Sequence, residues 1–321
     1  MAVYTHVSAE ALHEFLKAYD MDEVLAFKGI AEGVENSNYF LQTNKGRFIL
    51  TLYEKRVAEK DVPFFLALTA HLCARGFPCP KPIADKSGRV QSVLEGRPAA
   101  LIQFLEGVSI HKASPEHCAQ VGNVLARLHL ASQGFSLTRA NTQGMSTWRG
   151  LLQVCEKKID TYPHDVRDEL HAAMDGIERN WREDLPCGII HADLFPDNIL
   201  FRGGELKGVI DFYFACNDSL AYDIAICMNA WCFTPEWNFA PDNARALLGG
   251  YQQARALQKD EIDALPLLCR GAAIRFALTR LHDLIYHVDG SLVTPKDPME
   301  YLVKLRFHDG IKDIKGYGLE P

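Results

Sequence analysis

GIIHADLFPDNILFRGGELKGVIDF, residues 188–212, is the segment around which the rest of this chain can be interpreted. Apolar residues lead into a tight polar loop, and a glycine pair then separates two short apolar runs, so the pattern predicts a strand, a loop and a hairpin. The loop carries Asp193 and, five residues later, Asn198, and the second hairpin strand ends at Asp211. Three oxygen-bearing side chains on short elements suit a hard cation such as Mg²⁺ and leave one carboxylate to accept a proton.

Each of these residues also has an ordinary structural interpretation, because Asp and Asn are common turn residues. Their combined order and spacing, H-x-D-x-x-x-x-N followed by a later Asp, favour a functional site instead. The combination resembles the catalytic loop and metal-binding strand of the protein-kinase-like fold. Its form is similar to that of the small-molecule branch of this fold, which contains the aminoglycoside, choline and homoserine kinases.

The resemblance implies a two-lobe α+β fold and phosphoryl transfer from ATP to the hydroxyl of a small molecule. We expect a small β-rich N-terminal lobe over residues 1–105, which binds the nucleotide. A larger, mostly helical C-terminal lobe is expected over residues 106–321, and it carries the catalytic and acceptor-binding groups. The implied cofactors are ATP and Mg²⁺.

The same resemblance assigns roles to five side chains. Asp193 is expected to be the catalytic residue that accepts the proton of the acceptor hydroxyl, and Asn198 and Asp211 are expected to hold Mg²⁺. His191 and Asp223 are expected to support the site, His191 by bracing the loop backbone and Asp223 by anchoring the loop from the start of the next helix.

Hydrophobic periodicity predicts the elements around this segment. Strands are expected over 24–28, 39–43, 47–53, 89–95 and 98–104, and helices over 8–20, 61–75, 115–131, 150–161, 164–183 and 260–287. The first strands and their loop are similar to the phosphate-covering hairpin of a kinase, and residues 103–107 resemble the hinge that holds adenine. The residues expected to bind the nucleotide are therefore Gly29, Gly33, Asn38, Thr51, Gln103, Phe104 and Leu105.

The chain departs from the kinase pattern at two linked positions. Thr51 stands where a Lys or Arg would pair with the α- and β-phosphates, and residues 64–66 are apolar where a Glu would hold that Lys. The joint loss is electrostatically consistent, because a buried Glu without its Lys would be an unpaired charge. Lys55 and Arg56 are candidates for the replacement cation, with exposed surface charges as the alternative.

The acceptor is suggested by subfamily resemblance alone. The strand end TLYE (51–54) and the helical segment DIAICMNAW (223–231) resemble homoserine kinases, whose substrate needs partners for a carboxylate and an ammonium group. The candidate acceptor-binding residues are Glu35, Trp231, Arg275, Arg280 and Asp283. An Arg280–Asp283 pair within one helix and a core position for Trp231 are the competing interpretations.

Two other functions remain open at this point. A choline- or ethanolamine-type kinase would need an aromatic cage for its cationic substrate, whereas an aminoglycoside kinase would need a broad acidic surface that is not apparent in the sequence. The missing Lys–Glu pair suggests a non-catalytic ATP-binding module. The retention of Asp193, Asn198 and Asp211 argues against that module.

Composition agrees with a globular enzyme and excludes several classes. The 321 residues are 48% hydrophobic and 23% charged, and a net charge of −7 gives no reason to expect nucleic acid or an anionic membrane as a partner. The nine cysteines form no CxxC pair, which favours reduced thiols over disulfides or structural zinc. The first residues do not resemble a signal peptide, so we expect a cytoplasmic protein whose partner is a small-molecule substrate.

Overall fold

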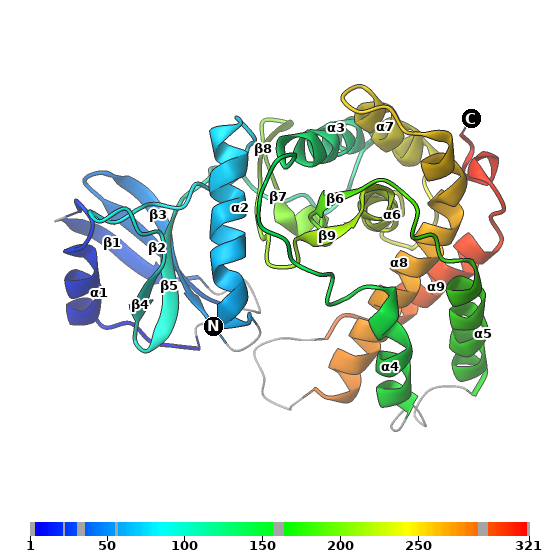
Figure 1. Cartoon of the computed structure of the whole chain (residues 1–321), viewed down its shortest axis with the longest axis horizontal. Helices are drawn as coiled ribbons and strands as arrows, with labels where there is room; N and C mark the ends of the chain where they lie inside the picture. Colours follow the sequence, from blue (N-terminus) through cyan, green and yellow to red (C-terminus); the bar gives the residue numbers. More distant parts are fainter. Residues whose placement is uncertain are drawn as a thin grey trace. The chain divides into compact units, whose positions relative to one another are not determined.

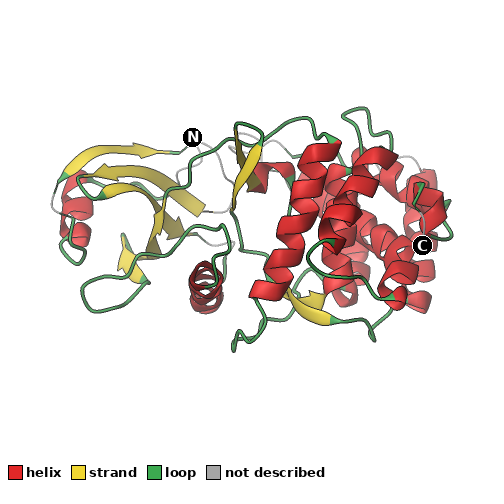
Figure 2. Ribbon diagram, turned by 90° about the horizontal axis from the view of Figure 1, so that it is seen from above, coloured by secondary structure: helices red, strands yellow, loops and turns green. Residues whose placement is uncertain are grey.

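The computed structural model describes residues 4–21, 23–30, 36–54, 57–156, 164–287 and 295–319. The chain divides into two compact units. Unit 1 contains the described residues of Met1–Gly107, Phe135–Arg139 and Lys207–Tyr213, and unit 2 contains those of Val108–Gly134, Ala140–Leu206 and Phe214–Pro321. Strands dominate unit 1 and helices dominate unit 2 (Figure 2).

Unit 1 is built on one antiparallel five-stranded sheet with the strand order β1-β2-β3-β5-β4 (Figure 1). Its strands are β1 (Val24–Gly29), β2 (Asn36–Thr43), β3 (Gly46–Tyr53), β4 (Ser92–Leu94) and β5 (Arg97–Gln103), and its helices are α1 (Ala9–Leu16), η1 (Glu59–Asp61) and α2 (Val62–Ala74). The first three predicted strands and the predicted helix over 61–75 are confirmed within a few residues. The predicted strand 89–95 is shorter than expected.

A shared apolar core holds α1 on the sheet of unit 1. Ser8 caps the helix, since its hydroxyl accepts from the backbone N–H of Ala11 at 3.1 Å. The apolar face of α1, which includes Leu12 and Leu16, packs with sheet residues such as Leu41 and Leu50 in one buried cluster. This packing joins α1 to the sheet whose strands β2 and β3 carry the nucleotide-binding candidates Asn38 and Thr51.

Unit 2 is a helical body with short strands at the predicted catalytic segment. Its helices are α3 (Pro115–Ala131), α4 (Met145–Glu156), α5 (His164–Asn180), α6 (Leu220–Trp231), α7 (Pro241–Gln252), α8 (Lys259–Ile285) and α9 (Met299–Asp309), with the 3-10 turns η3 (Pro196–Asn198) and η4 (Ile314–Tyr317). The strands β6 (Cys187–Ile190) and β9 (Cys216–Ser219) pair. The strand β7 (Ile199–Arg202) pairs with β8 (Glu205–Val209), in which the chain passes from unit 2 into unit 1 at Lys207. Periodicity had not singled out α7 or α9. No described helix is both long and apolar enough to span a membrane.

Two glycines let α3 and α7 approach each other closely. A Cβ on Gly122 would lie 1.9 Å from the carbonyl oxygen of Leu247, and one on Gly250 would lie 2.0 Å from that of Ala119. Any side chain at these positions would therefore push the helices apart. The close approach matters for the site, because α3 carries His129 and α7 carries Tyr251.

Candidate active site

The predicted catalytic residues of unit 2 lie together on the loop between β6 and β7. The side-chain amide nitrogen of Asn198 donates to the carbonyl oxygen of Asp193 at 2.8 Å and to its Oδ2 at 3.2 Å. Asn198 closes the turn η3, in which Pro196 restricts the backbone. The structure therefore brings Asp193 and Asn198 into contact, as the spacing predicted.

The backbone just before Asp193 is held in an unusual conformation. Ala192 has φ 63°, a left-handed value that costs free energy for a residue with a Cβ and persists only where surrounding contacts fix it. Asp223 supplies these contacts, since its carboxylate accepts from the N–H of His191 at 2.7 Å and of Ala192 at 2.9 Å. Arg275 adds a bond from Nη1 to the carbonyl oxygen of Ala192 at 2.7 Å.

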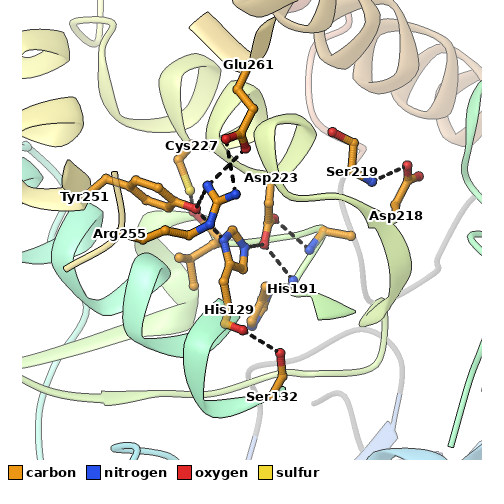
Figure 3. A network of polar contacts seen from close by, with 12 residues as sticks. His129, Ser132, His191, Asp218, Ser219, Asp223, Cys227, Tyr251, Arg255 and Glu261 are labelled. Carbon is orange, nitrogen blue, oxygen red and sulfur yellow. Dashed lines mark hydrogen bonds and ion pairs between the residues drawn. The ribbon is translucent and has the colours of Figure 1, made fainter. Parts of the chain in front are cut away.

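A buried chain of hydrogen bonds extends from Asp223 away from the loop (Figure 3). His129 Nε2 lies 3.2 Å from Asp223 Oδ2, and His129 Nδ1 lies 2.8 Å from the hydroxyl of Tyr251. Arg255 donates to the same hydroxyl at 3.0 Å and forms an ion pair at 3.0 Å with Glu261, whose side chain has no exposed surface. We call these five residues, Asp223, His129, Tyr251, Arg255 and Glu261, the loop-anchoring network.

The direction of the hydrogen bonds follows from the partners. Arg255 can only donate, so the Tyr251 oxygen accepts from it and donates its own hydrogen to His129 Nδ1. His129 Nε2 in turn donates to Asp223 Oδ2. Burial raises the pKa of the Asp223 carboxyl, but the hydrogen bond from His129 and the neighbouring histidines and backbone N–H outweigh it, so the pKa is lower than usual. Asp223 is therefore an anion that accepts hydrogen bonds from the loop.

Three of the predicted acceptor-binding residues lie in unit 2 as parts of its framework or on its surface. Trp231 is fully buried and donates from its indole nitrogen to the carbonyl oxygen of Leu194 at 2.7 Å. Arg275 is 2% exposed, and its guanidinium bonds to the loop backbone and lies 4.5 Å from the ring centre of Phe276. Asp283 is exposed. Trp231 is therefore a core residue, which was the competing interpretation of this position.

A fourth candidate in unit 2, Arg280, has a partner that the sequence did not suggest. Its Nη1 lies 2.6 Å from Glu300 Oε2 on α9, and its guanidinium lies 4.5 Å from the ring centre of Tyr301. The Nζ of Lys304 lies 4.5 Å from the centre of the same ring and 2.5 Å from Glu300 Oε1. The alternative Arg280–Asp283 pair within α8 is thus replaced by contacts between α8 and α9.

Unit 1 carries the nucleotide-binding candidates of the sheet. Thr51 is 1% exposed, and its hydroxyl donates to Asn38 Oδ1 at 2.8 Å across the β2–β3 pair. The position of the expected lysine is thus filled by a neutral hydrogen-bonded pair. Gly29 ends β1, opposite Tyr39 on β2.

The TLYE motif ends in a buried ion pair that the sequence did not reveal. Glu54 is 7% exposed, accepts from the Ser37 hydroxyl at 2.7 Å and lies 3.3 Å from Arg97 Nε. A strand-end Glu gave no local signal for this role, because its partners come from two other strands. This carboxylate links β2, β3 and β5 in unit 1.

The hinge candidates in unit 1 use part of their backbone within the unit. The backbone N–H of Gln103 donates to the carbonyl oxygen of Lys81 at 2.9 Å, and that of Phe104 donates to the carbonyl oxygen of Arg47 at 3.1 Å. The Phe104 ring packs edge-on against Phe40 with ring centres 5.4 Å apart. Leu105 lies against Gly208, where an added Cβ would be 2.5 Å from its Cδ1. The hinge segment therefore has a fixed backbone with apolar neighbours.

Asp211 belongs to unit 1, so the predicted trio is divided between the two units. Its φ is 62°, so Asp211 and Ala192 are both non-glycine residues of the predicted site with a left-handed backbone. A grouping of three or more His, Cys, Asp or Glu side chains suited to a metal is not found among the described ranges. Gly33, Glu35, Lys55 and Arg56 lie outside the described residues.

Comparison with known proteins gives a family and close relatives. The model of the phosphotransferase enzyme family matches residues 26–257. A homoserine kinase of Nitrobacter hamburgensis is 56% identical over 99% of this chain and 98% of its own length, and one of Parvibaculum lavamentivorans is 52% identical over 100% of both.

Solved structures resemble the fold at low sequence identity. An amicoumacin kinase has a TM-score of 0.70 at 15% identity and covers 95% of this chain and 94% of its own. An ethanolamine kinase of Plasmodium vivax has a TM-score of 0.64 at 14% identity and covers 96% and 92%, respectively. The predicted protein-kinase-like fold, with an antiparallel sheet in its N-terminal part and a helical C-terminal part, is thereby confirmed.

Proposed function

Because this chain belongs to the phosphotransferase enzyme family and, within it, to the homoserine kinases, we propose that it transfers the γ-phosphoryl group of ATP to the hydroxyl of L-homoserine. The product is O-phospho-L-homoserine, an intermediate of threonine biosynthesis. The observation that carries this assignment is the full-length identity of 52–56% to relatives named homoserine kinase. The intact Asp193–Asn198 loop supports an active kinase over a non-catalytic ATP-binding module.

Asp193 is the proposed catalytic base. Its carboxylate accepts a hydrogen bond from the acceptor hydroxyl, directs the hydroxyl oxygen at the γ-phosphorus and takes the proton as the new bond forms. The loop-anchoring network and Arg275 keep the backbone on which Asp193 stands from relaxing. Most of the rate enhancement would then come from positioning, because a misplaced base loses catalysis even when its chemistry is unchanged.

The donor set of the proposed metal site fits Mg²⁺. The nitrogen of the Asn198 amide is used by Asp193, which leaves its Oδ1 as the atom for a cation. Asp211 would add a carboxylate oxygen, and few protein ligands suffice because Mg²⁺ in such sites is also held by phosphates and water. Mg²⁺ held by Asn198 and Asp211 would supply positive charge that offsets the charge of the ATP phosphates.

The remaining assignments are proposals of the same kind. ATP would contact unit 1 through Gly29, Gly33, Asn38 and Thr51 and through the hinge residues Gln103, Phe104 and Leu105. The candidates for binding the acceptor are Glu35, Arg280 and Asp283. Trp231 and Arg275 would instead affect acceptor binding by holding the loop that carries Asp193. We also propose that the protein works in the cytoplasm as a nucleotide-binding lobe (1–105) and a catalytic lobe (106–321).

A coupled assay with Mg-ATP and a panel of acceptors tests the proposal. We expect turnover with homoserine and little with choline, ethanolamine, methylthioribose or kanamycin, and activity on another acceptor without activity on homoserine would refute the assignment. Asp193→Asn should lower kcat by about 10²–10⁴-fold with nucleotide binding nearly intact. Asp197→Asn is the matched control, because Asp197 lies on the same loop but is 63% exposed and pairs only loosely with Lys296 at 3.4 Å.

A further inference from the structure

Two cysteine side chains of unit 1 are in direct contact. Cys73 lies in the last turn of α2 and Cys79 in the loop that follows, and their sulfur atoms are 3.3 Å apart. The Cys73 sulfur is also 3.1 Å from the carbonyl oxygen of Cys79, and the Cys79 sulfur is 3.6 Å from that of Thr69. A disulfide has a sulfur–sulfur distance of about 2.05 Å. Bond formation therefore needs a movement of little more than 1 Å in total.

The two thiols differ in a way that suits a reactive pair. Cys73 is partly exposed, whereas Cys79 is buried. The hydrogen bond from the Cys79 thiol lowers the pKa of Cys73, against the effect of burial, and the charge of Lys81 adds to the lowering. The pKa of Cys79 is raised by its neighbour and by burial. Cys73 is thus the better nucleophile and the more accessible one, and Cys79 stays protonated beside it.

We propose that Cys73 and Cys79 form a redox-modification site that a hydroperoxide converts into an intramolecular disulfide. In the first step the Cys73 thiolate attacks the terminal oxygen of the hydroperoxide and the O–O bond breaks. The alkoxide or hydroxide that leaves takes up a proton from solvent to give an alcohol or water, and Cys73 becomes a sulfenic acid. In the second step the sulfur of Cys79 attacks the Cys73 sulfur, the S–O bond breaks, and the Cys79 proton leaves with hydroxide as water. Two thiols are oxidised and one peroxide is reduced.

The loop between the two cysteines is connected to the strand that leads to Asp211. The carbonyl oxygen of Pro78 accepts from the N–H of Val209 at 2.8 Å, and the Phe77 ring packs edge-on against Phe212 with centres 6.5 Å apart. These contacts are on both sides of Asp211 in the sequence and all lie in unit 1. Shortening the Cys73–Cys79 distance would pull on this loop, so oxidation should reach the proposed metal ligand.

Mass spectrometry tests the site without any use of activity. The reduced full-length protein is treated with hydrogen peroxide and digested, and we expect a Cys73–Cys79 linked peptide that has lost two hydrogen atoms. In Cys79→Ser the reaction should stop at a sulfenic acid on Cys73, trapped by dimedone, and Cys73→Ser should give neither product. Cys187 is the internal control: the residue is exposed, but its sulfur is partly buried, which raises the pKa of the thiol.

The outcomes distinguish the proposed redox site from the proposed kinase function. Oxidation of Cys187 before Cys73, or a disulfide through any other cysteine, would overturn the proposed site. The activity arm rests on the proposed function: peroxide should lower kcat/KM of the wild type several-fold, dithiothreitol should restore it, and Cys73→Ser should be insensitive. A complete disulfide with unchanged activity would overturn the connection to Asp211. An inactive reduced protein would instead refute the homoserine kinase assignment and leave the mass result valid.

Discussion

Replacing Tyr251 by Phe should destabilise unit 2, because the phenol oxygen is the middle member of the loop-anchoring network. That oxygen lies 2.8 Å from His129 Nδ1 and 3.0 Å from Arg255 Nη1, in a side chain with no exposed surface. A neutral hydrogen bond contributes about 1 kcal/mol and one to a charged group about 1.5–3 kcal/mol. Since Arg255 keeps its ion pair with Glu261, we expect a loss of about 2–3 kcal/mol, or about 4–8 °C in Tm.

Tyr301→Phe provides a matched control for this experiment. Tyr301 is equally buried, but its hydroxyl has no hydrogen-bond partner among the residues that the structure describes, and burial raises its pKa. Removing an unsatisfied buried hydroxyl should be neutral or slightly stabilising. Thermal melting and urea denaturation of both variants measure the difference. Equal losses in the two variants, or an unchanged Tyr251→Phe protein, would refute the argument from hydrogen bonding.

Three further predictions concern packing, protonation and the loop. Gly250→Ala should lower the free energy of unfolding by about 3 kcal/mol or more, because the added Cβ would clash with a carbonyl oxygen of α3. Gly249→Ala is the control: its Cβ would have no atom within 4 Å, so this change should stabilise the protein by about 0.5–1 kcal/mol. Equal effects of the two changes in denaturation would contradict the close approach of the helices. Burial lowers the pKa of His308 to about 3, so stability should fall as pH drops below about 6.5, by up to about 1.4 kcal/mol per unit, because only the unfolded chain takes up the proton. Urea denaturation between pH 7 and pH 5 should show this pH dependence of the unfolding free energy in the wild type and a weaker dependence in His308→Gln. Arg275→Lys should lower kcat and leave the KM for homoserine within about twofold; a tenfold rise in KM at constant kcat would make Arg275 a substrate ligand.

The contact between Asp193 and Asn198 could be predicted because it is local. Five residues of a proline-containing turn allow few backbone paths, so spacing and residue type determine which atoms meet. The loop-anchoring network could not be predicted in this way. His129 and Tyr251 are 122 positions apart, and their contact depends on the approach of α3 and α7. No periodicity in either helix indicates which residue faces the other.

The competing interpretation of Arg280, a pair with Asp283 within one helix, differs from the contact in the structure. An Asp three residues along a helix is a plausible neighbour, but such pairs contribute only about 0.2–0.5 kcal/mol. In the structure the Arg280 side chain is 11% exposed, and its guanidinium pairs with Glu300 and also stacks on Tyr301. A partly desolvated charge with two partners outweighs an exposed intrahelical pair. Local spacing does not indicate this contact, because Glu300 and Tyr301 lie on α9, about 20 positions further along the chain.

The two left-handed residues, Ala192 and Asp211, connect the sequence motif with its proposed chemistry. Neither is a glycine, so each adopts its φ at a cost that neighbouring contacts must offset. At Ala192 those contacts are known: two backbone N–H groups on the Asp223 carboxylate and one carbonyl on Arg275. The network behind Asp223 is therefore best understood as what keeps the loop from relaxing. In the proposed mechanism these residues act through the position of Asp193, so their loss should reduce stability and turnover together.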